Sequence, residues 1–183
     1  SCSIGLINEA QGSCRLHQGK TTSTALVYGP SAPKYSRHED SSSMSVEITY
    51  STSLGGGSGA GDALVGVGKE LKRVEREGAK FIRAGLLPAI DVSRCPRTLL
   101  VVKVVVDFDD GNALSVAFNA CVMALLNAGV AMLYTPVAIG TAFLSPSSIT
   151  NTIFAQSGSE ENDSSYLKVL CVDPNMEEEG HVL

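Results

Sequence analysis

The stretch TLLVVKVVVDFDDGNALSVAFNACVMALLNAG, at Thr98–Gly129, decides the fold of this chain. Its first part, Thr98–Val106, is almost continuously apolar, which predicts a strand that is buried on both faces. Residues 107–112 (DFDDGN) predict a turn. The alanine-rich run Leu114–Asn127, closed by Gly129, predicts an apolar helix. This order of strand, turn and helix can present backbone N–H groups at the helix start to an anion.

The residues on both sides of this unit predict further strands and one long helix. The expected elements are hairpin strands at Ser13–Gln18 and Thr21–Tyr28 with a turn near Gln18–Lys20, a strand at Met44–Tyr50 with Val46 and Ile48 on one face, a helix at about Leu64–Leu86, and strands at Tyr134–Phe143 and Tyr166–Asp173. This order predicts an α+β fold, a mixed α/β sandwich whose helices pack mainly on one face of a sheet.

The long helix is expected to be amphipathic, with a core face and a basic face. Residues at helical spacing predict the core face: Leu71, Val74, Gly78, Ile82 and Gly85. The opposite, solvated face would carry Lys69, Arg73, Arg76, Lys80 and Arg83.

The length fits a single domain. We expect it to span residues 1–173, with a flexible Gly/Ser loop at 51–62, a polar loop at 29–43 and an acidic tail at 174–183. No apolar run is long enough to predict a transmembrane helix, and the first residues do not resemble a secretory signal. The formal net charge is −5, so any contact with RNA should come from a local basic patch.

The cysteines and histidines indicate neither a metal site nor a catalytic triad. The five cysteines (Cys2, Cys14, Cys95, Cys121, Cys171) are odd in number and include no CxxC pair, which favours reduced thiols over disulfides or zinc ligands. The three histidines (His17, His38, His181) lack the local sequence of a nucleophile partner. We expect no metal and no cofactor.

Two glycine motifs have alternative interpretations. QGKT at Gln18–Thr21 resembles the end of a P-loop, but Cys14 stands where that loop needs its first glycine, so a hairpin turn is favoured. LGGGSGAGD at Leu54–Asp62 could cradle phosphate, as the glycine loop of small-molecule kinases of a related sandwich fold does. A flexible linker is favoured, and the kinase alternative rests on this stretch alone.

Four stretches together resemble the RNase PH family, in particular the exosome ring subunits with that fold, which is ribosomal protein S5 domain 2-like. They are GSCRLHQGKTTSTALVYGP at Gly12–Pro30, PKYSRHED at Pro33–Asp40, Pro-Arg-Thr at Pro96–Thr98, and Asp109–Gly129, which is similar to the family's D-A-G-(T/S)-x-x-x-x-x-x-N-A-x-x-x-A-L-x-D-A-G pattern. Their order and spacing agree over about residues 3–143.

The resemblance implies a subunit of a six-membered ring, built in eukaryotes from different subunits of this fold. It implies three kinds of partner: other RNase PH-like ring subunits, RNA-binding cap subunits and RNA, with no membrane. The expected location is the nucleus, nucleolus and cytoplasm. Active members use inorganic phosphate to cleave RNA from its 3′ end, and they hold that phosphate with arginine and with the turn's backbone and hydroxyl groups.

The chain departs from the active pattern at the phosphate turn. Active members read D-(G/A)-G-T-R, and this chain has Asp109, Asp110, Gly111, Asn112 and Ala113. Asn112 replaces the threonine, Ala113 replaces the arginine and Asp110 adds a negative charge. Losing a bidentate cation beside an added anion should weaken phosphate binding strongly. We therefore expect a vestigial phosphate site without a catalytic residue, in a structural subunit that guides RNA during 3′-to-5′ processing and degradation.

The candidate RNA-binding residues are Lys34, Arg37 and His38 in one loop, and Arg73 and Arg76 on the long helix. Arg73 is also the nearest counterpart of a second phosphate arginine in active members, and Asp163 is a loose counterpart of their late acidic residue. The alternative function is an active phosphate-dependent 3′-to-5′ exoribonuclease, in which another cation would have to replace the missing arginine.

Overall fold

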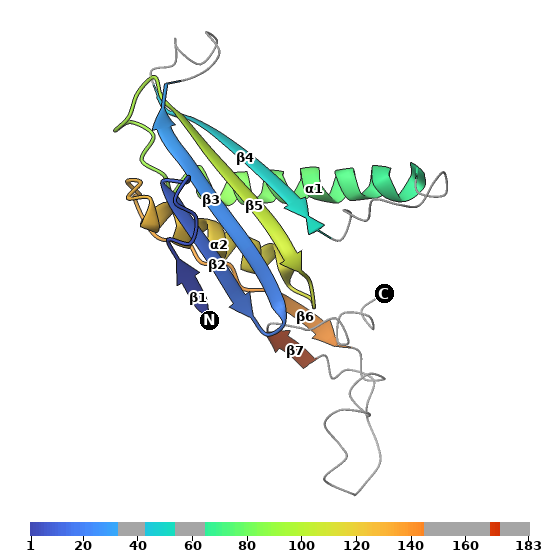
Figure 1. Ribbon diagram of the computed structural model, residues 1–183. Helices are drawn as coiled ribbons and strands as arrows, with labels where there is room; N and C mark the ends of the chain where they lie inside the picture. Colours follow the sequence, from blue (N-terminus) through green and yellow to red (C-terminus); the bar gives the residue numbers. More distant parts are fainter. Residues whose placement is uncertain (33–42, 54–64, 145–168, 173–183) are drawn as a thin grey trace, which may run out of the picture.

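The computed structural model describes residues 1–32, 43–53, 65–144 and 169–172 (Figure 1). In chain order the elements are β1 (Cys2–Ile4), β2 (Gly12–Gln18), β3 (Thr21–Ser31), β4 (Ser45–Thr52), α1 (Val65–Leu86), β5 (Leu99–Phe108), α2 (Ala113–Asn127), β6 (Thr141–Leu144) and β7 (Val169–Val172). None of the helices in these ranges is long and apolar enough to cross a membrane.

The main sheet has the strand order β1-β2-β3-β5-β4. Neighbouring strands are antiparallel except β4 and β5, which run parallel. A parallel pair needs a crossover connection, and α1 supplies it. Both helices lie on the same side of the sheet (Figure 1). The predicted α+β sandwich, with helices on one face, is confirmed.

Strand β5 has one buried face. Leu100, Val102, Val104 and Val106 are fully buried under the helices, whereas Lys103 between them is exposed. The prediction that both faces are buried is therefore wrong. An apolar run does not by itself reveal which face is covered, and in the described residues both helices pack on the same side.

The hairpin prediction is confirmed, with Gly19 in a left-handed conformation (φ 57°) at the turn between β2 and β3. The predicted loop at 29–43 begins too early, because β3 continues to Ser31. Past a register shift, Ser31 pairs with Leu99 of β5. The rest of that loop, at 33–42, and most of the glycine-rich stretch, at 54–62, lie outside the described residues, as does the tail at 174–183.

Helix α1 is confirmed, but its faces differ in part from the prediction. Ile82 and Leu86 are fully buried, whereas Val74 is 52% exposed. The helix runs past the end of β4 (Figure 1), so its earlier turns have less sheet to cover. Arg83 is exposed, as expected for the solvated face, and it also donates through Nη1 to the carbonyl oxygen of Val46. An arginine can extend along a helix to reach such an acceptor.

Helix α2 ends as predicted, and the C-terminal cap is complete. Gly129 adopts a left-handed conformation (φ 69°), its N–H donates to Leu126 O (3.1 Å), and Val130 N–H donates to Leu125 O (3.1 Å). These two bonds form a Schellman motif, which satisfies carbonyl groups that the helix leaves unpaired.

The strand predicted at Tyr134–Phe143 is mostly wrong, since only Thr141–Leu144 forms a strand, β6. The residues before it are held against α2 by one side chain, that of Asn119. Asn119 Nδ2 donates to Ala138 O (2.8 Å), and Ala138 N–H donates to Asn119 Oδ1 (2.9 Å). The segment has the apolar sequence pattern of a strand, but the Ala138 backbone makes its hydrogen bonds to a side chain and not to a neighbouring strand.

The short strand β7 confirms the centre of the one predicted at Tyr166–Asp173, and it pairs antiparallel with β6 in a separate two-stranded sheet. Two pairings have no counterpart in the predictions: the edge strand β1 and an isolated bridge between Ile90 and Met132.

The substitution Val104→Asp tests the buried face of β5. The substitution would place a carboxylate without a partner at a fully buried position. We therefore expect the unfolding free energy to fall by about 4 kcal/mol, or the protein not to fold at all. Urea denaturation followed by circular dichroism measures this. Thr49→Asp places the same charge on the exposed side of neighbouring β4 and should melt like the wild type. A folded, stable Val104→Asp protein would contradict the assignment.

The substitution Asn119→Ala tests the attachment of residues 135–138. It removes two hydrogen bonds and leaves the Ala138 backbone without these partners, at a cost of about 1–3 kcal/mol. Asn119→Asp keeps the acceptor but sets a carboxylate oxygen against the Ala138 carbonyl oxygen, so its loss of stability should be at least as large as that of Asn119→Ala. Equal stability of the wild type and both variants would show that the two Asn119–Ala138 hydrogen bonds do not stabilise the fold.

Candidate functional site

The predicted phosphate turn lies between β5 and α2, beside the β2–β3 turn. Thr21, at the start of β3, is 3% exposed and joins the two turns. Its Oγ1 donates to Gly111 O (2.8 Å) and accepts a hydrogen bond from Asp110 N–H (3.0 Å). Gly111 and Asn112 both adopt positive φ angles (101° and 58°). One buried hydroxyl therefore fixes a turn that most residues would not adopt.

Thr21 is a residue that the prediction missed as part of the site. It lies in the QGKT motif at Gln18–Thr21, which the structure places at a strand-to-strand hairpin. A P-loop joins a strand to a helix, so this geometry excludes the P-loop interpretation. Thr21 does lie in the Gly12–Pro30 stretch that resembles the family, and that was the only sign in the sequence of its place at the site.

The two aspartates of the turn have different partners. Asp109 Oδ1 accepts the Gly111 N–H (2.9 Å), so one oxygen of this carboxylate stabilises the turn. Asp110 Oδ2 lies 3.7 Å from Lys20 Nζ, and the lysine side chain is 76% exposed. The negative charge that Asp110 adds is thus partly offset by a lysine that was not predicted to belong to the site. A pair whose lysine is this exposed contributes only about 0–1 kcal/mol.

Asn112 and Ala113 are packed against other parts of the fold. Asn112 is the N-cap residue of α2, and its side chain makes no capping hydrogen bond. The backbone of Gly140 lies so close to the Asn112 amide that a Cβ at residue 140 would overlap it. Ala113 is only 9% exposed and belongs to the hydrophobic core. The start of α2 therefore carries an amide and a buried methyl group where active relatives are expected to carry a hydroxyl and a guanidinium.

The electrostatic surroundings of the turn are acidic on the side of β4 and α1. Burial, followed by the carboxylates of Asp109 and Glu75, raises the pKa of Tyr50 to about 12. Glu75 Oε1 also accepts the Thr52 N–H (3.3 Å), which places this α1 carboxylate at the end of β4. Carboxylates near the turn oppose the binding of a phosphate dianion, since like charges repel.

The predicted RNA-binding residues are only partly described. Arg73 Nε lies 3.1 Å from Glu77 Oε1 in an exposed pair one helical turn apart, and Arg76 is exposed on the same helix. Lys34, Arg37 and His38 lie outside the described residues, as does Asp163. Where the structure describes the chain, no group of three or more His, Cys, Asp or Glu side chains lies close enough together to hold a metal ion.

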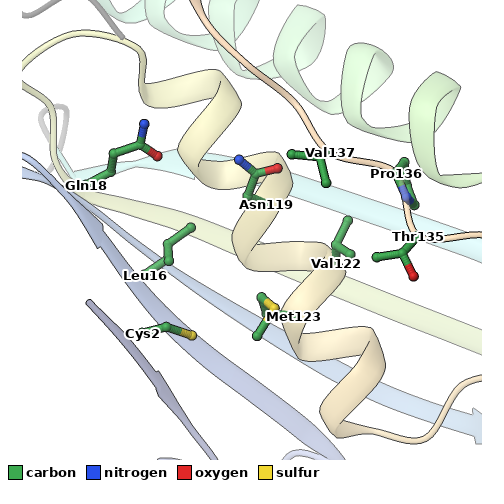
Figure 2. A pocket seen from close by; sticks show the side chains of 9 residues that line it. All are labelled: Cys2, Leu16, Gln18, Asn119, Val122, Met123, Thr135, Pro136 and Val137. Atoms are coloured by element: carbon green, nitrogen blue, oxygen red, sulfur yellow. The ribbon is translucent and has the colours of Figure 1, made fainter.

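A separate cavity of about 320 Å³ lies along α2, away from the turn at its start (Figure 2). It is bounded by β1 and β2, by α2 and by the segment that Asn119 holds. The lining residues are uncharged: Cys2, Leu16, Gln18, Asn119, Val122, Met123, Thr135, Pro136 and Val137. An uncharged, largely apolar lining does not suit a phosphate group, so this cavity is distinct from the predicted site.

Comparison with known proteins agrees with the fold and with the quoted motifs. Residues 1–131 match the RNase PH family model, described as the 3′ exoribonuclease family, domain 1. Over 144 residues the chain is 31% identical to a rice (Oryza sativa subsp. japonica) protein named exosome complex exonuclease RRP46 homolog, covering 79% of this chain and 54% of that protein. The Arabidopsis thaliana protein of the same name is 27% identical over 139 residues, covering 76% and 52%.

Solved structures show the same fold. A crystal structure of rice Rrp46 superposes with a TM-score of 0.69 at 24% identity, covering 100% of this chain and 70% of that one. An archaeal exosome core structure gives a TM-score of 0.54 at 18% identity, covering 97% and 65%. The chain spans about half the length of the curated relatives it matches. With a family model matching residues 1–131 and an RNase PH-like α+β fold, the chain belongs to the RNase PH family of 3′ exoribonucleases.

Proposed function

We propose that this chain is a subunit of an exosome-type ring, surrounded by other RNase PH-like subunits and topped by RNA-binding cap subunits. Membership of the family and the names of the two plant relatives support the proposal. A ring subunit needs apolar surface for its neighbours. Residues 133–139 carry several large apolar side chains that are exposed by 52–72%: Leu133, Tyr134, Val137 and Ile139.

The proposed role is structural and RNA-guiding, without phosphorolysis by this chain. The observation that carries it is the packing of the start of α2, where the Asn112 amide meets Gly140 and the Ala113 methyl group is buried. Without a bidentate arginine, a phosphate would rely on backbone N–H groups next to Asp109 and Asp110. Charge-assisted bidentate bonds are about twice as strong as neutral ones, so their loss removes the strongest contacts that a phosphate would make.

RNA contact is proposed through Arg73 and Arg76 of α1 and through Lys34, Arg37 and His38, which lie outside the described residues. The Arg73–Glu77 pair supports this role rather than opposing it. An exposed pair at this helical spacing is worth about 0.3–0.5 kcal/mol, so Arg73 can exchange its carboxylate for an RNA phosphate. By this proposal the protein acts in the nucleus, nucleolus and cytoplasm, with no cofactor.

One observation favours a second candidate, an active phosphate-dependent 3′-to-5′ exoribonuclease. Lys20 lies beside the turn, it is 76% exposed, and its ammonium group faces Asp110. A lysine at this place is a point charge that could hold phosphate where the arginine is missing. In that case inorganic phosphate would be the co-substrate, and Lys20 would be essential.

A phosphorolysis assay separates the two candidates. We expect the purified chain, incubated with a short single-stranded RNA, to release no nucleoside diphosphates with or without inorganic phosphate. The variant Ala113→Arg should gain no activity, because residue 113 is buried and the new guanidinium would have to leave the core to reach a phosphate. Circular dichroism checks that this variant folds.

Phosphate-dependent shortening of the RNA by the wild type would overturn the structural role. The same assay with Lys20→Ala would then decide the alternative. A loss of on the order of tenfold or more in that variant would identify Lys20 as the replacement cation. The matched variant Lys80→Ala, which removes an exposed lysine from α1, should leave the rate unchanged.

Assembly is a separate prediction. Tagged protein purified from its own cells should bring with it other proteins that match the RNase PH family model, together with RNA-binding cap proteins, in stoichiometric amounts by native mass spectrometry. Val137→Glu places a charge on an exposed apolar position of the proposed interface at residues 133–139. This variant should bring fewer of these neighbours with it. Recovery of the chain alone, from both nuclear and cytoplasmic extracts, would contradict the ring proposal.

A further inference from the structure

Two thiols lie in contact at the edge of the main sheet. The Sγ atoms of Cys2 in β1 and Cys14 in β2 are 3.4 Å apart. In the register of this pair, Cys2 faces Leu16 and Ile4 faces Cys14. Residues two apart on a strand share a face, so Cys2 and Cys14 are diagonal neighbours on the helix-facing side of the sheet.

The two thiols differ in their access to solvent. Cys14 is fully buried, whereas Cys2 is exposed. Cys2 also lines the 320 Å³ cavity, where its side chain points toward α2 on the side of Met123 (Figure 2). A small molecule in this cavity or in solvent can therefore reach Cys2, while Cys14 can be reached only through Cys2 or by opening of the fold.

We propose that Cys2 and Cys14 form an oxidisable pair, in which a peroxide oxidises Cys2 and Cys14 then closes a disulfide. The Cys2 sulfur attacks one peroxide oxygen, the O–O bond breaks, and the thiol proton leaves with the other oxygen as water or an alcohol. The product is a sulfenic acid on Cys2. The Cys14 sulfur attacks that sulfur, and the sulfenic hydroxyl leaves with the Cys14 proton as water. Two electrons pass from the two thiols to the peroxide.

The burial of Cys14 fixes the order of these steps. Burial raises the pKa of Cys14 to about 12, with the adjacent Cys2 as a further cause. The thiolate is the reactive form, so Cys14 reacts slowly with an oxidant in solution. Contact with Cys2 compensates for this, because a partner held in place reacts at a very high effective concentration. Cys121 lies deeper on α2, where burial also raises its pKa, and it remains a thiol.

The disulfide would tie the edge strand to the sheet. Strand β1 is a short, exposed strand whose pairing in the main sheet is to β2 alone. A bond between residues 2 and 14 would hold that pairing and would also restrict the unfolded chain, both of which favour the folded state. A thiol reductant reverses the bond by exchange, so the oxidation state would set the stability of this edge.

Peptide mapping tests the pair directly. The full chain is reduced, freed of reductant, treated with an equimolar amount of hydrogen peroxide, denatured and alkylated. Glu9 lies between the two cysteines, so a protease that cuts after glutamate separates their peptides unless a bond joins them. We expect the joined pair, lighter than the sum of the two free-thiol peptides by about 2 Da, with Cys95, Cys121 and Cys171 alkylated. The oxidised protein should melt at a higher temperature than the reduced one.

Matched variants complete the test. Cys2→Ser replaces an exposed residue and should fold normally, and it should form no disulfide and show no rise in melting temperature on oxidation. Cys95→Ser should behave like the wild type. Cys14→Ser changes a core residue, so Cys2→Ser remains decisive if that protein does not fold. Full alkylation of Cys2 and Cys14 after peroxide, a bond from Cys14 to Cys121, or oxidation of Cys2 to a sulfinic acid without a bond would each overturn the proposal.

Discussion

Close packing of α2 on the sheet is the constraint on which the rest of the structure depends. The backbone of Gly12 in β2 lies against the carbonyl of Ala124 and against Ala128, with no space for a side chain at residue 12. The buried face of α2 is rich in alanine, so the helix can approach the strands at short range. Ser13 N–H donates to Asn127 Oδ1 (3.0 Å) and fixes the end of the helix. Because the helix is continuous, its packing on the sheet also determines where its first residues lie.

The position of α2 explains the state of the turn before it. With the helix so close to the sheet, residue 113 points into the core, and only a small side chain fits there without rearrangement. Thr21 holds the turn from the neighbouring hairpin, while Gly140 closes against Asn112. The polar groups of the turn are therefore used in contacts within the fold. The nearby carboxylates of Asp109 and Glu75 add a field that favours cations over anions.

The outer flank of α2 is apolar like its inner flank, and a helix of this kind requires cover on both sides. The sheet covers one side, and residues 135–138, held by Asn119, cover part of the other. The cavity with Cys2 at its wall lies where this cover meets the edge strand β1. Val137, one of the exposed apolar side chains of residues 133–139, also lines this cavity. The surface proposed for neighbours and the cavity proposed to admit an oxidant thus meet at Val137.

The sequence by itself determined the order of the main elements, because each of them carries a local pattern: an apolar run for β5, an alanine-rich helix closed by glycine for α2, and a glycine turn for the β2–β3 hairpin. It also predicted the candidate phosphate site at Asp109–Ala113, since four family-like stretches stand in order. Only the tertiary structure decided that β5 has one buried face, that residues 135–140 are not a strand, and that Thr21, Lys20 and Gly140 meet the turn. These features depend on contacts between residues far apart in the chain, and no local pattern contains the packing geometry that creates them.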